Sequence, residues 1–248
     1  MIGMGETIMD IIFRNGQPQA AVHGGSSFNS IVSVGRAGVP CVFVGDTGAD
    51  IVGRQTLDFM RANHVDTDYC PMRPDVKSAV SLAYLDDNGD ASYVFYKQKP
   101  EAPKEWTLPQ IGADDVLLYG SYFASCRGMR PLVEDMLSHA TAGGAIIYYD
   151  INFRSSHSHE LEALLPTIED NCRRSSIVRG SADDFEVLFG QRDAATIYDR
   201  HIRKLCPVFI CTSGAGAVTV CLPHGTLRFP VPRVDDVAST VGAGDNFN

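Results

Sequence analysis

The sequence predicts an α/β fold built on a mostly parallel sheet with helices on both faces. Short apolar runs alternate along the chain with segments of helical periodicity, the pattern of repeated β-α-β units. The chain has 248 residues, 44% of them hydrophobic and 21% charged, which suffices for a large core without disulfides. Ligands of such sheets bind at the carboxyl ends of the strands, so polar motifs that follow strands are candidate sites.

The elements follow one another in a regular order. Apolar runs predict strands at 1–5, 8–13, 39–44, 116–119, 145–149, 176–179 and 208–212. Helical spacing and helix-end signals predict helices at about 24–35, 51–63, 130–142, 160–172, 182–189 and 193–205. Pro131 in a first turn and Gly143-Gly144 at the end delimit the third of these helices.

A second β region interrupts this alternation. Residues 79–85 and 91–96 are β-rich, and Asn88-Gly89 between them is typical of a hairpin turn. Together with residues 10–23, which contain a turn at 15–18, they predict a small sheet separate from the parallel core.

Charge and composition exclude several classes of protein. A net charge of −9 argues against a nucleic-acid or anionic-membrane binder, because such affinity comes from clustered Lys and Arg. No apolar run approaches the roughly 20 residues of a membrane span, and the first residues lack the layout of a signal peptide. The seven cysteines sit mostly in apolar runs without metal-site spacing, which predicts buried free thiols in a reducing cytoplasm.

The most informative motif is Thr240-Val241-Gly242-Ala243-Gly244-Asp245-Asn246-Phe247. Gly242, Ala243 and Gly244 allow a tight turn whose N–H groups converge on an anion, and Asp245 beside them could accept a proton from an attacking hydroxyl. A glycine-rich turn with Asp245 as a helix N-cap is the structural alternative.

Two further motifs lie at predicted strand ends. Gly24-Gly25 precedes a helix whose first turn carries Asn29, a donor and acceptor for hydroxyls; capping by Ser26 or Ser27 is the alternative. Asp150-Ile151-Asn152-Phe153-Arg154 follows the strand at 145–149, where an α/β site recruits polar groups, although a solvated loop is equally compatible.

Two weaker motifs complete the set. Ser181-Ala182-Asp183-Asp184 has the spacing of a helix cap, and its carboxylate could instead hold Mg²⁺ through water. The glycine-rich run 212–217 fits either a nucleotide contact or a β-turn. Walker-type, nucleophile-elbow, zinc-protease and protein-kinase motifs do not occur.

In order and spacing these motifs resemble the ribokinase/PfkB carbohydrate kinase family over the whole chain. Residues 24–53 are similar to the family's N-terminal signature, 237–247 to its C-terminal signature, and 150–154 to its Asp-Pro-Asn-x-Arg. The start Gly5-Glu6-Thr7-Ile8-Met9-Asp10 is similar to the fructokinase and ketodeoxygluconate kinase branches.

The resemblance implies a ribokinase-like fold with a small β-sheet lid. The α/β core would comprise 1–10, 24–75 and 101–248, and the lid 11–23 and 76–100. The implied site consists of sugar-binding Asp10, Gly24, Gly25, Asn29 and Arg154; an anion hole at Gly242, Ala243 and Gly244 with Asp245 as base; nucleotide-facing Thr212, Gly214, Gly216 and Ser181; and Asp184 on Mg²⁺. ATP, Mg²⁺ and K⁺ are the implied cofactors, and a homodimer through the lid is expected because an uncovered sheet edge favours pairing.

Three departures from the family pattern stand out. Ser239-Thr240-Val241 replaces the usual Asp-Thr before the glycine motif, which weakens a monovalent-cation site. Ser181 to Asp184 replaces Asn-x-x-Glu, which makes water-mediated Mg²⁺ binding less secure. The chain ends three residues after Asp245, where family members continue, so we expect a truncated product or fragment.

The predicted activity is in-line transfer of the γ-phosphoryl group of ATP to a sugar hydroxyl in a fructokinase-like reaction. A ketodeoxygluconate or nucleoside kinase is the alternative within kinases. A sugar-binding protein without catalysis is the alternative of another class. A Rossmann dehydrogenase is disfavoured, because Gly3-Met4-Gly5-Glu6-Thr7-Ile8 lacks the third glycine of the dinucleotide fingerprint.

Overall fold

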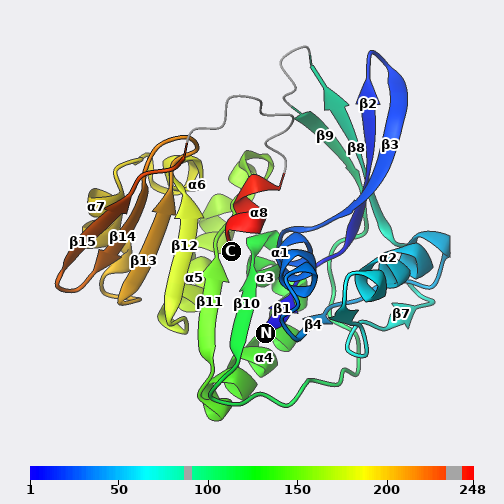
Figure 1. Cartoon of the computed structure of the whole chain (residues 1–248), viewed down its shortest axis with the longest axis horizontal. Coiled ribbons are helices and arrows are strands. Elements are labelled where there is room, and N and C mark those ends of the chain that lie inside the picture. The colour runs from blue at the N-terminus through cyan, green and yellow to red at the C-terminus, as the bar shows by residue number, and fades with distance from the viewer. Residues whose placement is uncertain (87–90, 233–241) are drawn as a thin grey trace. The chain divides into compact units, whose positions relative to one another are not determined.

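The computed structural model describes residues 1–86, 91–232 and 242–248, which fold into two compact units. The first unit comprises residues 1–100, 105–109 and 239–247, and the second comprises 101–104, 110–238 and 248. The first unit therefore contains segments from both ends of the sequence, blue and red in Figure 1.

Part of the first unit is an α/β layer around a small apolar core. Its parallel strands are β1 (Ile2–Met4), β4 (Cys41–Val44) and β6 (Val65–Asp66). Its helices are α1 (Ser26–Arg36), α2 (Ile51–Ala62) and α8 (Ala243–Phe247). A short parallel pair, β5 (Thr47–Gly48) and β7 (Met72–Arg73), accompanies them. Phe28 and Ile31 of α1 pack with Phe43 of β4 and Met60 of α2, all at most 1% exposed. The apolar spacing along both helices produces this core.

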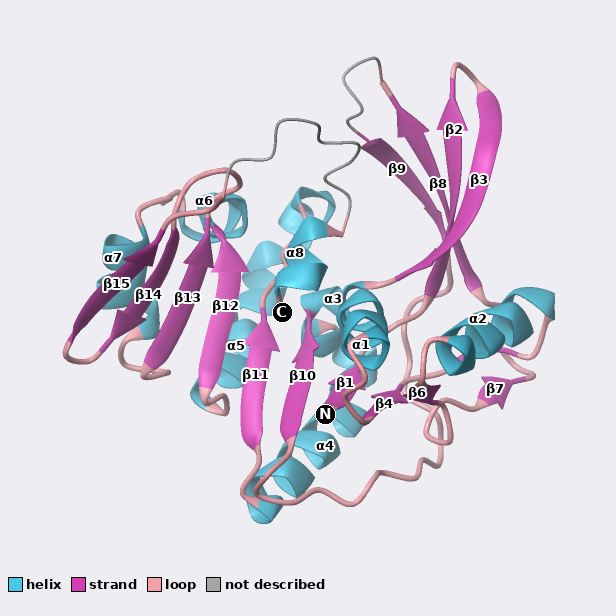
Figure 2. Ribbon diagram, in the orientation of Figure 1, coloured by secondary structure: helices cyan, strands magenta, loops and turns pink. Residues whose placement is uncertain are grey.

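The other part of the first unit is a separate four-stranded sheet. Its strands are β2 (Ile8–Arg14), β3 (Gln17–Gly24), β8 (Ala79–Leu85) and β9 (Ala91–Tyr96), in the order β3-β2-β8-β9 (Figure 2). Asn15 and Gly16, with φ of 51° and 71°, connect β2 to β3 in the left-handed conformation that tight hairpins require. The Asn88-Gly89 turn expected between β8 and β9 lies outside the described residues.

The described residues of the second unit contain six strands in the spatial order β15-β14-β13-β12-β11-β10 (Figure 1). They are β10 (Val116–Gly120), β11 (Ile146–Asp150), β12 (Ile177–Ser181), β13 (Val208–Thr212), β14 (Val218–Leu222) and β15 (Gly225–Phe229). β10 to β13 pair in parallel, as their connecting helices require, whereas β14 and β15 add antiparallel strands at the edge. The antiparallel edge was not predicted from the sequence.

Helices connect the parallel strands of this unit. They are α3 (Ser121–Ser125), α4 (Arg130–Gly143), α5 (Leu161–Arg173), α6 (Ala182–Phe189) and α7 (Ala194–Ile197), with short 3-10 turns at Arg127–Met129 and Ser155–Glu160. As predicted, Pro131 lies in the first turn of α4, and Gly144 caps this helix with a φ of 75°.

The helix predicted at 193–205 differs from the observed one. α7 gives way to a π-helix at Tyr198–Ile202, where the N–H of Arg203 donates to the carbonyl of Tyr198. The buried residues here are Ala194, Ile197, Tyr198, Ile202 and Cys206. From Tyr198 onward they recur every fourth position. A regular α-helix turns 100° per residue and would carry this spacing around its surface, whereas the wider π turn keeps Tyr198 and Ile202 on the core side.

All seven cysteines are free and buried, as the sequence predicted. In the described part of the chain, no helix is both long and apolar enough to cross a membrane.

Candidate active site

The carboxylate of Asp245 lies against helix α1 of the first unit. The Nδ2 of Asn29 donates to the Oδ2 of Asp245 at 2.8 Å, and the hydroxyl of Ser30 donates to the backbone carbonyl of Asp245 at 2.7 Å. Asp245 is 6% exposed. Residues of the two sequence signatures, 216 positions apart, are thus joined by a direct hydrogen bond.

A second set of contacts joins α8 to α1. The hydroxyl of Ser33 donates to the side-chain oxygen of Asn246, whose Nδ2 donates to the carbonyl of Gly242 at 2.9 Å. Gly242 has a φ of 75°, in the left-handed region that favours glycine, and α8 begins at the next residue, Ala243. Gly242 therefore turns the chain into a helix whose first residues are Ala243 and Gly244. Ser239, Thr240 and Val241 lie outside the described residues.

Asp10 is placed by the small sheet. It lies on β2 opposite Ser81 of β8, and the buried hydroxyl of Ser81 donates to the Oδ1 of Asp10. A Cβ at Gly24 would come within 2.8 Å of the Oδ2 of Asp10. Glycine at position 24 thus leaves space for the carboxylate, at the point where β3 leads into α1.

Gly25 provides a close backbone approach at the start of α1. Its φ is 125°, and a Cβ there would lie 2.3 Å from the carbonyl oxygen of Glu6. Gly25 is the N-cap of α1 without any side-chain capping bond, so the alternative that Ser26 or Ser27 caps this helix is not what the structure shows. The carboxylate of Glu6 forms an ion pair with Lys97, at 2.8 and 2.9 Å from the Nζ.

In the second unit, three neighbouring strands bring polar groups together at their carboxyl ends. Asp150 of β11 pairs in register with Arg179 of β12, and Ser181 pairs with Thr212 of β13. The Nη1 of Arg179 lies 2.9 Å from the Oδ1 of Asp150, and its Nη2 donates to the Oγ1 of Thr212 at 3.1 Å. Both ion-pair side chains are at most 5% exposed.

Two opposing effects act on the pKa of Asp150. Burial raises the pKa of Asp150, and the charge and hydrogen bond of Arg179 oppose that rise. The Nδ2 of Asn248 donates to its second oxygen at 2.8 Å. Asp150 is thus a structural partner of Arg179, and not the solvated loop residue that the sequence left as an alternative.

Ser181 and Asp184 form the helix cap that their spacing predicted. The Oδ2 of Asp184 accepts from the backbone N–H of Ser181 at 2.6 Å and from its hydroxyl at 2.8 Å, and the hydroxyl of Ser181 accepts from the N–H of Asp184 at 3.1 Å. Burial raises the pKa of Asp184, and these bonds oppose the rise. Only the Oδ2 of Asp184 takes part in these bonds, and the residue is 8% exposed.

The remaining predicted residues of the second unit are exposed. Arg154 follows Asn152, which has a φ of 36°, and its guanidinium forms no ion pair or hydrogen bond with the described residues. Gly214, with a φ of 50°, and Gly216 belong to the turn between β13 and β14, closed by a 2.7 Å bond from the N–H of Gly216 to Ser213. Over residues 1–86, 91–232 and 242–248, no three His, Cys, Asp or Glu side chains are grouped to hold a metal ion.

Several residues that make the contacts described above were not predicted from the sequence. Arg179 lies in the middle of an apolar strand, and the ion pair of Glu6 with Lys97 joins positions 91 residues apart. Ser30 and Ser33 were read as helix residues only. A charged residue inside an otherwise apolar parallel strand was the one available signal, because such a residue needs a buried partner.

Comparison with known proteins supplies the family. Residues 4–248 match the pfkB family carbohydrate kinase. The chain belongs to this family. As a member, it is a phosphotransferase of the class that uses an alcohol group as acceptor.

Its relatives include two kinds of kinase. An aminoimidazole riboside kinase of Salmonella typhimurium is 30% identical over 98% of this chain and 77% of the relative. A fructokinase of Rhizobium leguminosarum bv. trifolii is 27% identical over 98% of this chain and 76% of the relative.

Solved structures confirm the predicted fold class of this kinase family member. The aminoimidazole riboside kinase of Salmonella enterica, complexed with aminoimidazole riboside and an ATP analogue, has a TM-score of 0.85 at 27% identity, covering 99% of this chain and 81% of that one. A fructokinase of Vibrio cholerae O395, bound to fructose, ADP and potassium, has a TM-score of 0.87 at 21% identity, covering 99% and 80%. The shared fold is ribokinase-like: a large, mostly parallel sheet with helices and a small separate sheet.

Proposed function

We propose that this PfkB family member transfers the γ-phosphoryl group of ATP to a sugar hydroxyl, with Asp245 as general base. The hydrogen bond between Asn29 and Asp245 carries the proposal, because it places the carboxylate beside a residue expected to bind hydroxyls. Asp245 accepts the proton of the attacking hydroxyl, and Asn29 fixes the direction of its carboxylate. The N–H groups of Gly242, Ala243 and Gly244 stabilise negative charge on the transferred phosphoryl group.

The sugar is bound by the groups at the base of the small sheet. Asp10, held by Ser81, and Asn29 accept and donate hydrogen bonds to hydroxyls, while Gly24 and Gly25 allow close approach. The segments 11–23 and 76–100 serve as the lid, and the rest of the chain as the core. Arg154, unpaired within the described residues, contributes positive charge to the sugar or phosphate.

The nucleotide is assigned to the exit of β13 in the second unit. Thr212, Gly214 and Gly216 at the exit of β13, together with Ser181, are assigned to ATP. The Oδ1 of Asp184, which takes no part in the helix cap, is assigned to the water shell of Mg²⁺, which in kinases neutralises charge on the β- and γ-phosphates. K⁺ is the third proposed cofactor, tested by replacing K⁺ with Na⁺ in the assay.

Fructose is the first proposed acceptor, and a riboside is the second. Several fructokinases are among the relatives, at 22 to 27% identity, whereas the riboside kinase is 30% identical. A coupled ADP-release assay with ATP, Mg²⁺ and K⁺ should therefore compare fructose, ribose, ketodeoxygluconate, adenosine and aminoimidazole riboside. Sugar binding without turnover of any acceptor would support the sugar-binding protein instead.

The base assignment is tested by Asp245→Asn with Asp58→Asn as a matched control. We expect kcat to fall about 10²- to 10⁴-fold in Asp245→Asn, the usual contribution of a general base, with a smaller change in KM. Asp58 is an exposed aspartate of α2 in the same unit, so its variant should keep the parent rate. Circular dichroism and the melting temperature check the fold. A parent-like kcat in Asp245→Asn would remove Asp245 from the mechanism.

A homodimer through the lid and a cytoplasmic location complete the proposal. β9 is an edge strand with exposed apolar side chains, namely Tyr93, Val94, Phe95 and Tyr96, at 38 to 62% exposure. Light scattering after size exclusion tests the dimer, and a monomer at all concentrations would contradict it. Seven free thiols fit a reducing compartment.

A further inference from the structure

A cavity of about 190 Å³ lies within the second unit, among residues to which the proposed phosphoryl transfer assigns no role. It is bounded by α5, the end of α6, the π-helix and the loop after β11. Its apolar lining includes Ile151, Ile168, Cys172, Ile202 and Leu205.

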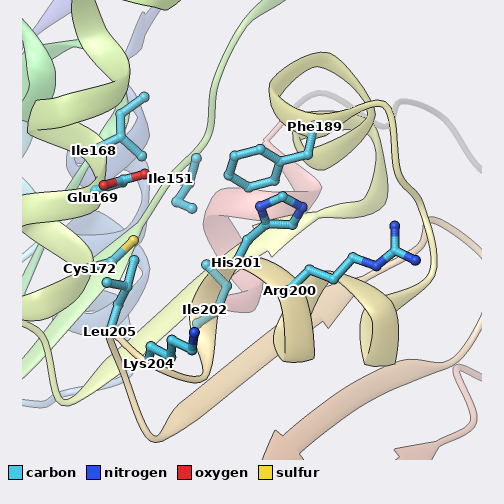
Figure 3. A pocket seen from close by; sticks show the side chains of 10 residues that line it. All are labelled: Ile151, Ile168, Glu169, Cys172, Phe189, Arg200, His201, Ile202, Lys204 and Leu205. Atoms are coloured by element: carbon cyan, nitrogen blue, oxygen red, sulfur yellow. The ribbon is translucent and has the colours of Figure 1, made fainter.

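Most of the cavity wall is apolar. Ile151, Ile168, Cys172 and Ile202 are each at most 2% exposed. The rings of Phe189 and His201 stack at 3.9 Å with an interplanar angle of 2°, and Figure 3 shows them on the wall opposite the side chains of α5. A cavity of roughly 150 Å³ with such a lining accommodates benzene, so this one has room for a single ring with a small substituent.

The mouth carries positive charge in an otherwise acidic protein. Arg200 and Lys204 form no ion pair or hydrogen bond with the described residues, and in Figure 3 the ammonium group of Lys204 lies beside Ile202. The guanidinium of Arg200 points outward in this view, but its long stem lets it turn toward a ligand.

The one acidic lining residue is already neutralised. Glu169 forms an ion pair with Arg173 at 3.0 Å, one turn along α5. Burial, and then the nearby charge of Arg200, lower the pKa of His201, so its ring is neutral at pH 7 and extends the apolar wall. Burial raises the pKa of Cys172, so its thiol is not a nucleophile. The charge left at the mouth is that of Lys204 and Arg200.

The local backbone is of a kind associated with ligand sites. Arg200, His201 and Ile202 all belong to the π-helix, and single π turns occur frequently at functional sites. The turn presents an arginine, an imidazole and an apolar side chain in succession at one opening. Ile151, on the opposite side, is bonded through its N–H to the carbonyl of Arg179 at 2.9 Å and so is firmly held.

We propose that this cavity binds a small organic monoanion with an apolar ring or branched body, such as an aromatic carboxylate. The body occupies the space between Ile151, Ile168 and the stacked rings, and the carboxylate faces Lys204. The site uses none of the residues assigned to the sugar or to ATP. It lies directly behind the loop that carries Asn152 and Arg154, so its occupant contacts that loop through Ile151.

Benzoate and benzyl alcohol are the probes, since they share a ring and differ in charge. The experiment titrates each into the full chain carrying ¹³C-labelled isoleucine methyl groups, which reports on Ile151, Ile168 and Ile202. We expect benzoate to shift these three resonances saturably, with benzyl alcohol binding about tenfold more weakly because it lacks the charged hydrogen bond.

Lys204→Gln and Arg203→Gln are the matched variants. Arg203 lies on the same segment, outside the cavity, and pairs with Asp199. We expect Lys204→Gln to weaken benzoate about five- to tenfold while Arg203→Gln changes it less than about twofold. Leu205→Trp, with its melting temperature as a fold check, should abolish the shifts by filling the cavity.

Three results would overturn the proposal. They are the absence of benzoate-dependent shifts in the parent chain, equal affinity for benzoate and benzyl alcohol, and equal affinities in the two charge variants. Shifts that persist in a folded Leu205→Trp variant would place the ligand elsewhere and reject the site as well.

Discussion

Replacing Arg179 by methionine is expected to destabilise the second unit strongly. Arg179 and Asp150 form an ion pair at 2.9 Å with side-chain exposures of 5% and 2%. Methionine keeps much of the apolar stem of the arginine but removes its charge and its bond to Thr212. Among the described residues, the buried carboxylate of Asp150 would then keep the Nδ2 of Asn248 as its side-chain hydrogen-bond donor.

The expected magnitude follows from this geometry. At an effective dielectric constant of about 20, two charges at this separation attract by roughly 6 kcal/mol, which offsets the desolvation of both groups. Deleting one partner leaves the desolvation of the other uncompensated, so Arg179→Met should lower the free energy of unfolding by about 3–5 kcal/mol. The double variant Asp150→Asn/Arg179→Met removes both charges of this pair and should recover most of that loss.

The free energy of unfolding that Arg179→Met loses relative to the parent protein should increase with pH. Burial already raises the pKa of Asp150, and without the opposing charge of Arg179 the folded-state pKa rises further. A folded-state pKa above the unfolded value means that the folded protein binds the proton more tightly. The variant therefore loses the least free energy of unfolding at acidic pH. Its loss relative to the parent protein grows as the pH rises through the raised folded-state pKa of Asp150.

Urea denaturation followed by circular dichroism, at several pH values, measures these effects. Arg203→Met is the control, because Arg203 and Asp199 form an exposed pair that contributes below about 1 kcal/mol. A loss of the same size in Arg179→Met and Arg203→Met, or a double variant as unstable as Arg179→Met, would refute the reasoning. A loss of free energy of unfolding that does not change with pH would also refute it.

Three further substitutions test the local structure. Ser181→Ala removes the capping box of α6 and should lower the unfolding free energy by about 1 kcal/mol in urea denaturation; an unchanged midpoint would show that the cap is dispensable. Gly25→Ala places a Cβ 2.3 Å from the carbonyl oxygen of Glu6 at a φ of 125°. We therefore expect a melting temperature several degrees lower and a higher KM for the sugar. Parent-like values of both would contradict the close approach. Tyr119→Phe removes a buried hydroxyl that is 3.1 Å from Ser175, at an expected loss of about 1 kcal/mol by calorimetry; a gain in stability would indicate that the hydroxyl is poorly satisfied.

The sequence by itself determined the class of fold and the positions of most elements. Apolar runs and helical spacing are local patterns, so β11, β12, α4 and α6 lie within one or two residues of their predicted ranges. The capping pattern at Ser181 is local too, and it was correct. The π-helix and the antiparallel edge formed by β14 and β15 were not predicted, because packing and strand pairing decide them.

Tertiary structure alone decided which polar groups meet. Asn29 and Asp245 are 216 residues apart, and nothing in either motif specifies that one donates to the other. Arg179 could not be predicted as the partner of Asp150, because the register of β11 and β12, not sequence spacing, places the two residues side by side. Local propensity fixes where strands and helices form, whereas hydrogen bonds and ion pairs between distant segments depend on the folded chain.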